Sequence, residues 1–595
     1  MSDALLPFEQ RLHAVGPRLR RQLARLYGAD SVAPLWSRIE ATLRDADRAR
    51  APALRALDDM RLADPDWFVS PDMIGYSTYV DRFAGTLAGL TAHVDHLEEL
   101  GVRYLHLLAL LKARSGDSDG GFAVADYLAV EPRLGTMDEV EALAERLRAG
   151  RISLCVDLAL NHTADDHAWA LRAKAGEAHY QAFYHILSPE EAAARERDLA
   201  QVFPTTAPGN FTAVPEAGGQ VWTTFYPFQW DLNWANPDVM VAMIEVMLTL
   251  ANRGFEAFRL DSTAFLWKQA GTDCRNLPQA HYIVRALRAA LDIAAPATLL
   301  KAEAIVPTAF VPPYFGADEG EGFEPECHLV YNNSLMVSGW VGLAEGSAAL
   351  PRAIVAASGG LPAGANWLSY ARCHDDIGWG AVLGDLRAID PDPVARLRAA
   401  ARFTDGDTPE SWSRGEPFQS DGSVLHGSNG MMASLAGLEA AGDDPERREM
   451  ALRRIALLHA LAIASGGLAT IYMGDEAGLL NDRSYADDPD HAHEGRWLHR
   501  PAMDWSALAS DAAKRIAGDL AALRRARIQS GGAGAPAVIT SADARILALR
   551  CGGDRVLLNF SGDVVPVEAG GRDRLSGAID PGLGAWQVLW LEGEE

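Results

Sequence analysis

The chain has 595 residues and is 48% hydrophobic, which excludes a disordered protein and predicts several domains, because one core does not grow to this size. Its 80 acidic residues outnumber the 54 lysines and arginines, so the formal charge is −26. Such a surface repels phosphate backbones, and we therefore expect no nucleic-acid partner.

The first part of the chain, from Phe8 to about Ala63, has a helical pattern throughout. Apolar residues recur at three- and four-residue steps among arginines, which is the spacing of an amphipathic helix. We expect this stripe to pack on the next domain, and no chemistry is visible in it. We place an all-helical N-terminal domain at residues 1–72. The stripe consists of Leu12, Val15, Leu19, Leu23 and Leu26.

Strands and helices alternate from Met73 onward. Repeating βα units predict a parallel sheet, and their total length suits a closed eight-stranded α/β barrel of the TIM type. We place the barrel at residues 73–160, 236–376 and 442–530. The expected strands are Ile74–Val80, Tyr104–Leu108, Ile152–Asp157, runs ending at Asp261, Glu303 and Asp375, a poorly defined His328–Tyr331, and Ala469–Met473. The expected helices are Leu90–Leu100, Met137–Ala149, Pro237–Gly254 and Glu449–Ser465.

Two irregular stretches interrupt this alternation. Residues 161–235 are rich in proline, glycine and aromatic residues, and predict a small domain inserted after the third strand. Residues 377–441 are rich in Asp, Gly and Pro and predict a second inserted domain after the seventh strand. From residue 531 the pattern changes to short strands, which predict a C-terminal β-sandwich at 531–595.

Several features predict the cellular location. Met1–Glu9 has neither the basic region nor the apolar core of a signal peptide. The longest apolar stretch, Ile455–Met473, is broken by His459 and two glycines, and so predicts a helix followed by a strand, not a membrane span. Five scattered cysteines without metal-type spacing indicate reduced thiols. We expect a soluble, cytoplasmic protein without a membrane partner. The cysteines are Cys155, Cys274, Cys327, Cys373 and Cys551.

Three of the apolar runs end in carboxylates. The run Gly254–Ser262 places Arg259 and Asp261 at its end, the run Thr298–Glu303 ends in Glu303, and Trp367–Asp376 ends in a histidine and two aspartates. A buried parallel strand delivers its last residues to the rim of a barrel, where active sites of this fold lie. The sequence therefore predicts carboxylate chemistry at the mouth of the barrel.

The motifs that carry these residues resemble those of the α-amylase family (glycoside hydrolase family 13), over about Met73 to Glu595. Asp157–His162 resembles the family's region at the end of strand three, and Arg259–Asp261 resembles the nucleophile strand. Glu303 resembles the acid/base, and His374-Asp375 the pair that stabilises the transition state. Four such motifs in the right order are specific, although each alone is weak.

The resemblance implies a retaining mechanism with two carboxyl groups about 5–5.5 Å apart. Asp261 is then the nucleophile, kept ionised by Arg259 on the same strand face. Glu303 is the general acid and later the base, with a pKa raised by neighbouring negative charge. The sugar hydroxyls and the transition state are held by Asp375, His374 and His162.

Further motifs resemble those of the amylosucrases within the family, and this resemblance extends over nearly the whole chain. Gln229–Asn233 looks like the marker of the oligo-glucosidase branch, in a form close to the amylosucrase one. The N-terminal helical domain and the second insert are also amylosucrase-like. Further matching segments are Val221–Phe225, Ala264–Gln269, Asn276–His281, His374–Trp379 and Gly495–Pro501.

In that group an aspartate and a late arginine close the floor of the glucose pocket, and the matching residues are Asp119 and Arg496. A closed floor admits one glucosyl unit, which fits sucrose and excludes a threaded starch chain. Phe122 stands where the family usually has a tyrosine, so stacking on glucose is kept and one hydroxyl is lost. The remaining substrate-binding residues, on the fructosyl or acceptor side, are Phe225, Gln229 and Asp376.

Cofactors and assembly are only weakly constrained by the sequence. Asn161 helps to bind calcium in some family members, but no complete oxygen cage accompanies it, so we expect no metal and no cofactor. The expected partner is a small-molecule substrate, sucrose, with the chain as a monomer or homodimer.

The fate of the glucosyl group depends on the acceptor side. Amylosucrases line this side with arginines, one of them three residues before a Phe-Pro pair, where this chain has Ala200. A second expected arginine is absent from Gly427–Gly430, and the second insert has Pro391–Pro393 in place of a basic segment. We therefore predict a sucrose hydrolase with minor transglucosylation, and keep amylosucrase as the alternative. Arginine forks donate to several sugar hydroxyls at once, so their loss weakens an oligosaccharide acceptor.

Two further readings remain open. A maltose or isomaltose α-glucosidase is possible, and Asp119 with Arg496 argues against it. A non-catalytic, amylase-like subunit would be expected to lose acids and often to carry a membrane span. This chain keeps Asp261, Glu303 and Asp375.

Overall fold

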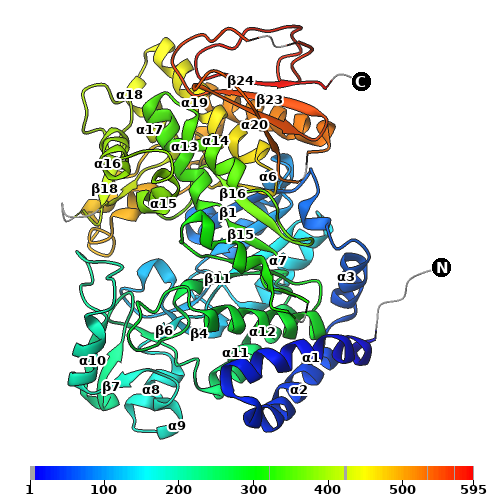
Figure 1. Ribbon diagram of the computed structural model, residues 1–595, viewed down its shortest axis with the longest axis vertical. Helices are drawn as coiled ribbons and strands as arrows, with labels where there is room; N and C mark the ends of the chain where they lie inside the picture. The colour runs from blue at the N-terminus through cyan, green and yellow to red at the C-terminus, as the bar shows by residue number, and fades with distance from the viewer. Residues whose placement is uncertain (1–6, 321, 421–424, 533, 568–569, 594–595) are drawn as a thin grey trace.

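The computed structural model describes residues 7–320, 322–420, 425–532, 534–567 and 570–593. At its centre eight parallel strands close into a barrel, with the N-terminal helices below it and the C-terminal sheet above it in Figure 1. The predicted (β/α)8 barrel is thereby confirmed. The barrel strands, in order around the ring, are β1 (Ile74–Tyr79), β2 (Tyr104–Leu108), β5 (Ser153–Ala159), β11 (Ala257–Asp261), β12 (Leu299–Ala302), β15 (Leu329–Tyr331), β16 (Asn366–Tyr370) and β20 (Leu468–Tyr472).

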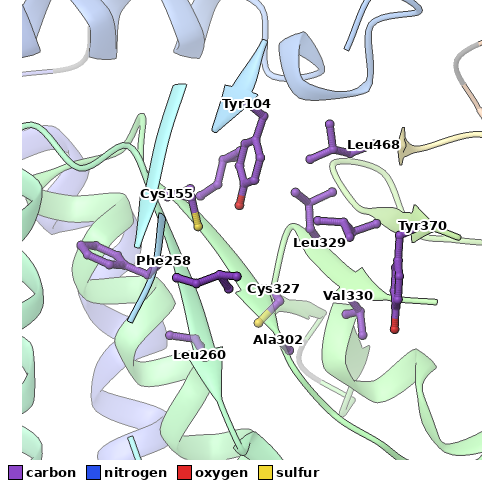
Figure 2. Packing of buried hydrophobic residues seen from close by; sticks show 14 of the residues in the cluster. Tyr104, Cys155, Phe258, Leu260, Ala302, Cys327, Leu329, Val330, Tyr370 and Leu468 are labelled. Carbon is purple, nitrogen blue, oxygen red and sulfur yellow. The ribbon is translucent and has the colours of Figure 1, made fainter. Parts of the chain in front are cut away.

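The barrel is a packed core and not a pore. Its strands are buried along their whole length apart from Tyr331, as expected for strands covered by helices on the outside. Figure 2 shows Tyr104, Cys155, Leu329 and Leu468, from four different strands, among the side chains of this core. The covering helices include α7 (Met137–Ala149), α11 (Pro237–Asn252), α12 (Pro278–Ala294), α13 (Asn333–Glu345), α19 (Pro445–Ala464) and α20 (Asp511–Ser530).

The strand register brings charged residues of the barrel side by side. Arg259 of β11 pairs with Asp157 of β5 on one side and with Lys301 of β12 on the other. Residues in register on neighbouring parallel strands point to the same face. A short layer of charge therefore lies inside the barrel, directly below its C-terminal rim.

The N-terminal helices pack on the outside of the barrel, as predicted. They are α1 (Phe8–Tyr27), α2 (Val32–Ala49) and α3 (Pro52–Ala63). Leu19 and Leu23 of the predicted stripe are fully buried. Arg11 donates from Nε to the carbonyl of Ile293 at the end of α12 (2.8 Å), and Arg21 donates from Nε to Glu324 Oε1 (3.0 Å). These contacts fix the helices to the barrel by both apolar packing and charge.

Each predicted insert folds into small sheets and short helices near the barrel mouth. Between β5 and α11 lie β6 (His162–Ala164), α8 (Ala168–Lys174), α9 (Ala178–Gln181), β7 (Ile186–Leu187), α10 (Pro189–Glu196), β8 (Phe211–Val214), β9 (Gly219–Trp222) and β10 (Gln229–Asp231). Between β16 and α19 lie β17 (Ile377–Gly378), α15 (Leu383–Leu386), α16 (Pro393–Thr404), β18 (Glu416–Phe418), β19 (Gly427–Asn429), α17 (Met432–Leu435) and α18 (Leu438–Ala441). The exact domain boundaries stay predictions.

The C-terminal region is rich in strands, as expected. One antiparallel sheet contains β21 (Ala537–Ile539), β22 (Ile546–Cys551), β23 (Asp554–Asn559) and β24 (Val588–Leu591). One face joins the main core through Leu547 and Leu558, and the other packs on Val565 and Leu583, which form a bridge of their own. The sheet therefore has a packed layer on each side.

The structure corrects two of the predicted elements in particular. The seventh strand stops at Tyr370, not at Asp375, because Arg372 folds the following loop by donating to the carbonyls of Gly430 and Asp375, both at 2.9 Å. The predicted helix Leu90–Leu100 is divided at His93 into α5 (Leu87–Ala92) and α6 (Val94–Glu99). The ring of His93 stacks on Trp505 with a centroid distance of 3.9 Å.

Two of the features used to predict the cellular location, the absence of a membrane span and of a signal peptide, can be compared with the structure only in part. Within the described residues, none of the helices combines the length and the apolar character needed to cross a bilayer. Residues 1–6, which carry most of the segment inspected for a signal peptide, lie outside the described residues.

Candidate active site

A cavity of about 840 Å³ opens where the barrel strands end and the two inserts meet. It brings together residues from β11, from the loops after β2, β5, β12 and β16, and from the inserts. Of the residues predicted for the site, all but Gln229 line it. They are Asp119, Phe122, His162, Phe225, Arg259, Asp261, Glu303, His374, Asp375, Asp376 and Arg496.

One buried guanidinium connects the acidic groups of this cavity. Arg259 donates from Nη1 to Asp261 Oδ1 (2.7 Å) and to Asp157 Oδ1 (2.9 Å), and its Nη2 lies 2.6 Å from Glu303 Oε1 as an ion-pair contact. Its side chain is 2% exposed, and Asp375 lies 3.9 Å away. A single cation thus serves three carboxyl groups in a poorly hydrated place, where unpaired charge is costly.

Ser262 forms a second bridge between the two nearest carboxyl groups. Its backbone N–H donates to Glu303 Oε2 (3.0 Å), and its hydroxyl donates to Asp261 Oδ2 (2.9 Å). Both bonds are possible because Ser262 has a left-handed backbone with φ of 54°, a conformation that costs roughly 1 kcal/mol or more outside glycine. Asp261 and Glu303 are therefore fixed relative to each other from both sides.

The environment keeps Glu303 protonated at neutral pH. Its pKa is raised to about 8, mainly by burial and also by the nearby carboxylates Asp261 and Asp375, while Arg259 acts in the opposite direction. Arg259 does not cancel these effects because its charge is shared among three carboxyl groups.

Arg496, whose Nη1 lies 3.6 Å from Asp375 Oδ1, pairs with two further carboxyl groups. Its Nη2 donates to Asp119 Oδ1 (2.8 Å), and its Nε donates to Glu494 Oε1 (2.9 Å). Tyr226 also donates to Glu494, at 2.9 Å. Despite burial, Arg496 lowers the pKa of Glu494 to about 2, whereas burial raises the pKa of Asp119 to about 7. One guanidinium does not fully balance two buried carboxylates, and Asp119 is the less favoured of the two.

Gln229 lies behind the cavity and not in its wall. It is fully buried, donates from Nε2 to Asp119 Oδ2 (3.2 Å), and lies 3.0 Å from His162 Nε2. The prediction that Gln229 borders the acceptor side is therefore wrong. Gln229 holds Asp119 and His162, which do line the cavity. This arrangement depends on the pairing of β10 with β6, which places Asp231 opposite His162.

Two histidines present neutral rings to the cavity, because burial lowers the pKa of both His162 and His374. The ring of His374 stacks on Phe122 at a centroid distance of 5.5 Å, and its Nε2 lies 3.3 Å from Asp375 Oδ2. Arg500 anchors this loop by donating twice to the carbonyl of His374, at 3.1 and 2.9 Å. The predicted site residue His374 is thus held through its ring by Phe122 and through its carbonyl by Arg500.

Asn161, which by resemblance corresponds to a calcium ligand of some family members, already has a cation beside it. Lys268 donates from Nζ to Asn161 Oδ1 (3.2 Å) and pairs with Asp231 Oδ2 (2.5 Å). A buried ammonium at this point repels a divalent cation, so Asn161 does not fit a calcium site. Among the described residues, Cys373, His374 and Asp375 offer ligand atoms within 4.8 Å of one another, and these residues belong to the cavity itself.

Comparison with known proteins agrees with this geometry. The family model "Alpha amylase, catalytic domain" matches residues 46–325, which include Arg259, Asp261 and Glu303. The segment that this model covers belongs to the α-amylase family. Its similarity to curated members is partial, because the chain spans about half the length of the first relatives that it matches.

Two curated members of the α-amylase family illustrate this similarity. A trehalose synthase/amylase of Mycobacterium tuberculosis is 30% identical over 322 residues, which are 53% of this chain and 52% of that protein. A glucosylglycerate phosphorylase of Spirochaeta thermophila is 32% identical over 324 residues, with 53% and 51% covered.

Solved structures of the α-amylase family share the fold of this chain. The sucrose 6F-phosphate phosphorylase from Thermoanaerobacter thermosaccharolyticum is 18% identical, with a TM-score of 0.64 over 82% of this chain and 93% of that chain. The isomaltulose synthase from Klebsiella sp. LX3 is 15% identical, with a TM-score of 0.62 over 88% and 99%. At such identities the likeness concerns the fold alone.

The sequence did not point to several residues that support the α-amylase-type site. His106 lies between Asp157 Oδ1 (3.1 Å from its Nε2) and Lys301 Nζ (3.2 Å from its Nδ1), below Arg259. Burial lowers the pKa of His106 to about 4 and that of Lys301 to about 8. A charged residue inside an otherwise apolar strand was the available signal. Glu494, Ser262 and Arg500 gave no such signal, because their contacts depend on how the loops at the barrel rim fold.

Proposed function

We propose that this protein is a retaining sucrose hydrolase that cleaves sucrose to glucose and fructose through a covalent glucosyl-enzyme. The observation that carries the proposal is the ion pair between Arg496 and Asp119, 2.8 Å long, in the wall of the cavity. We take this pair, with Glu494 bonded to the same guanidinium, as the closed floor of the glucose pocket, which leaves room for one glucosyl unit. A disaccharide with a single glucose suits such a pocket, and a continuing glucan chain does not.

In the proposed mechanism Asp261 attacks the anomeric carbon while Glu303 protonates the leaving oxygen. The attack needs an ionised carboxylate, which Arg259 stabilises at 2.7 Å. Protonation needs a neutral carboxyl group, and the raised pKa of Glu303 supplies one at neutral pH. In retaining enzymes the two carboxyl groups are about 5–5.5 Å apart. The contacts of both Asp261 and Glu303 with Arg259 and Ser262 support such a short separation.

The second step reverses the proton transfer. Glu303, now ionised, removes a proton from water, and the water oxygen attacks the anomeric carbon and releases Asp261. Asp375 and the neutral rings of His374 and His162 bind the sugar hydroxyls during both steps. Phe122, parallel to His374, offers an apolar face for the ring of the glucose.

We propose that water is the main acceptor. Besides Arg259 and Arg496, the described lining includes Arg275, whose guanidinium lies 5.0 Å from the ring centroid of Phe265. Ala200 and Gly427–Gly430, where amylosucrases would carry arginines, offer no such donors. An oligosaccharide acceptor would find few charged hydrogen-bond partners on this side.

Product analysis after incubation with sucrose tests the proposal. We expect nearly equal amounts of free glucose and fructose, and the same products with and without inorganic phosphate. A large excess of fructose over glucose, with an iodine-staining glucan, would identify an amylosucrase. Phosphate-dependent formation of glucose 1-phosphate would identify a phosphorylase, the activity in the name of one curated relative. Absence of sucrose cleavage by folded protein would reject the proposal altogether.

A further inference from the structure

A buried lysine lies one layer below the carboxyl groups of the cavity. Lys301 of β12 stands two residues before Glu303 and is 1% exposed. Its Nζ lies 3.2 Å from His106 Nδ1 and 4.8 Å from the ring centroid of Tyr331, and within the described residues it forms no salt bridge with a carboxylate. An ammonium in such a place costs free energy, and a buried charge that is kept at a cost beside a reactive group indicates a role in the chemistry.

Hydrogen bonds connect Lys301 with the guanidinium that serves the site. Burial lowers the pKa of His106 to about 4, so its ring is neutral and accepts from Lys301 at Nδ1. Its Nε2 then carries the proton and donates to Asp157 Oδ1 at 3.1 Å. Asp157 in turn accepts from Arg259 at 2.9 Å. The pKa of Lys301 is lowered to about 8, mainly by burial, which still leaves the ammonium charged at neutral pH.

The charges of this buried group balance while no sugar is bound. Glu303 holds its proton at neutral pH. The negative charges are those of Asp157 and Asp261, which both accept from Arg259. The positive charges are those of Arg259 and Lys301. Two cations therefore face two anions, which lowers the cost of burying each of them.

The groups around this set do not disturb the balance. Asp375 lies 3.9 Å from Arg259. It has two further guanidinium groups beside it, since Arg496 and Arg500 lie 3.6 and 4.0 Å from it. Burial raises the pKa of three further titratable groups near Lys301, so they are uncharged at neutral pH. They are Tyr104 of β2, Cys155 of β5 and Tyr331 of β15.

In the proposed function, on which this inference rests, the same balance holds in the glucosyl-enzyme. The ester removes the charge of Asp261, and Glu303 is ionised because it has given its proton to the leaving group. One negative charge has thus moved from Asp261 to Glu303, and the two cations still face two anions. Without the charge of Lys301 the buried group would carry an excess negative charge in this state. Protonation of Glu303 would remove that charge, and with it the base that the second step needs.

We propose that Lys301 is a positioning residue of the reaction, whose charge keeps Glu303 ionised in the glucosyl-enzyme so that it accepts a proton from water. The charge acts through Asp157, part of whose charge it offsets. Arg259 is thereby left to serve Asp261 and Glu303. In the step concerned the water oxygen bonds to the anomeric carbon, the ester bond to Asp261 breaks, and Glu303 takes the proton of the water. Lys301 neither gains nor loses a proton in this step.

Two variants remove this charge. Lys301→Met fills a similar volume without a charge, and Lys301→Gln is also neutral but keeps an N–H that can donate to His106. Each removes a buried charge that has no carboxylate partner in the described parts of the chain, so both are expected to melt close to the wild type. Lys514→Met is the matched control, because it removes the same charge from an exposed position of α20 that does not line the cavity.

The donor is α-glucosyl fluoride, because its leaving group needs no proton and Glu303 is then required only as the base. We expect the acid limb of the pH profile of kcat to move up by about one pH unit in both variants, the effect of a charge about 7 Å away in an effective dielectric of about 20. Below this limb kcat falls about tenfold and KM falls with it, so kcat/KM, which reports the first step, is unchanged. Lys514→Met keeps the wild-type profile. A purely structural role of Lys301 would lower kcat/KM as well and leave the acid limb in place.

An acid limb that stays in place in both folded variants would overturn the inference and leave the proposed function intact. Failure of both variants to fold would also overturn it, because Lys301 would then serve stability. If the wild type hydrolyses the fluoride but not sucrose, and the limb moves in the variants, sucrose as the substrate is rejected and the role of Lys301 stands. If the folded wild type uses neither donor, both are rejected.

Discussion

Replacement of Glu303 by glutamine is expected to stabilise the protein while it removes the activity. The folded-state pKa of Glu303 is about 8 against an ordinary value of 4.5, so ionisation is disfavoured in the fold. Below about pH 4.5 the group is protonated in both states and the wild type has no penalty. As pH rises from there toward about 8, the unfolded chain ionises and the folded one does not, so wild-type stability falls by about 1.4 kcal/mol per pH unit.

Glutamine carries no charge and can still accept from Arg259 and Ser262. The advantage of Glu303→Gln should therefore grow by about 3 kcal/mol between about pH 5 and about pH 7.5. With an unfolding entropy of about 2.1 cal/mol/K per residue, this corresponds to about 2 °C in melting temperature if the whole chain unfolds together. A barrel that unfolds by itself would show a larger shift.

The assay is differential scanning fluorimetry of both proteins across this pH range, with Glu216→Gln as the control. Glu216 is an exposed glutamate of the first insert, and its replacement should give no pH-dependent difference. A melting difference between wild type and Glu303→Gln that is constant with pH, or that decreases as pH rises, would refute the burial argument. Activity measured in parallel should fall by about 10² to 10⁴ through loss of the general acid.

The remaining predictions concern the reaction. In a folded Asp261→Asn variant, sucrose turnover should be abolished, because the covalent step is lost while volume is kept; substantial turnover would remove Asp261 from the nucleophile role. Glu303→Gln should be partly rescued by α-glucosyl fluoride, whose leaving group needs no proton, and equal loss on sucrose and the fluoride would argue for another role. The kcat/KM for sucrose should fall as pH rises through about 8, where the buried acid loses its proton, and a profile flat to about pH 9 would contradict this. Arg496→Ala should lower kcat/KM by a factor that corresponds to a few kcal/mol, because Asp119 is left buried with Glu494 nearby. An unchanged value would show that the pair of Arg496 and Asp119 has no part in catalysis.

Much of the fold could be predicted from local patterns. The helix Met137–Ala149 and the strand Tyr104–Leu108 were placed at their observed ends, since a capping box at Thr136 and a short β-branched or leucine-rich run are local signals. The end of the seventh strand was not, because the turn after Tyr370 is made by Arg372 bonding to Gly430, 58 residues away. Secondary structure is predicted less well where a distant partner ends the element.

The candidate site divides in the same way. The order and wording of the motifs around Asp261, Glu303 and Asp375 predicted which carboxylates meet, because parallel strands of a barrel bring their carboxyl ends to one rim. The pairing of Arg496 with Asp119, across 377 positions, came from the resemblance to relatives and not from any local pattern.

The sequence by itself determined the barrel, its carboxylates and their order. Only the tertiary structure decided that Gln229 supports Asp119 and His162 from behind, that Glu494 shares Arg496, and that burial, more than neighbouring charge, raises the pKa of Glu303. The reason is that a pKa and a hydrogen-bond partner depend on burial and on charges that arrive from separate strands and inserts. A linear pattern names such residues, but their spacing in three dimensions decides what each one does.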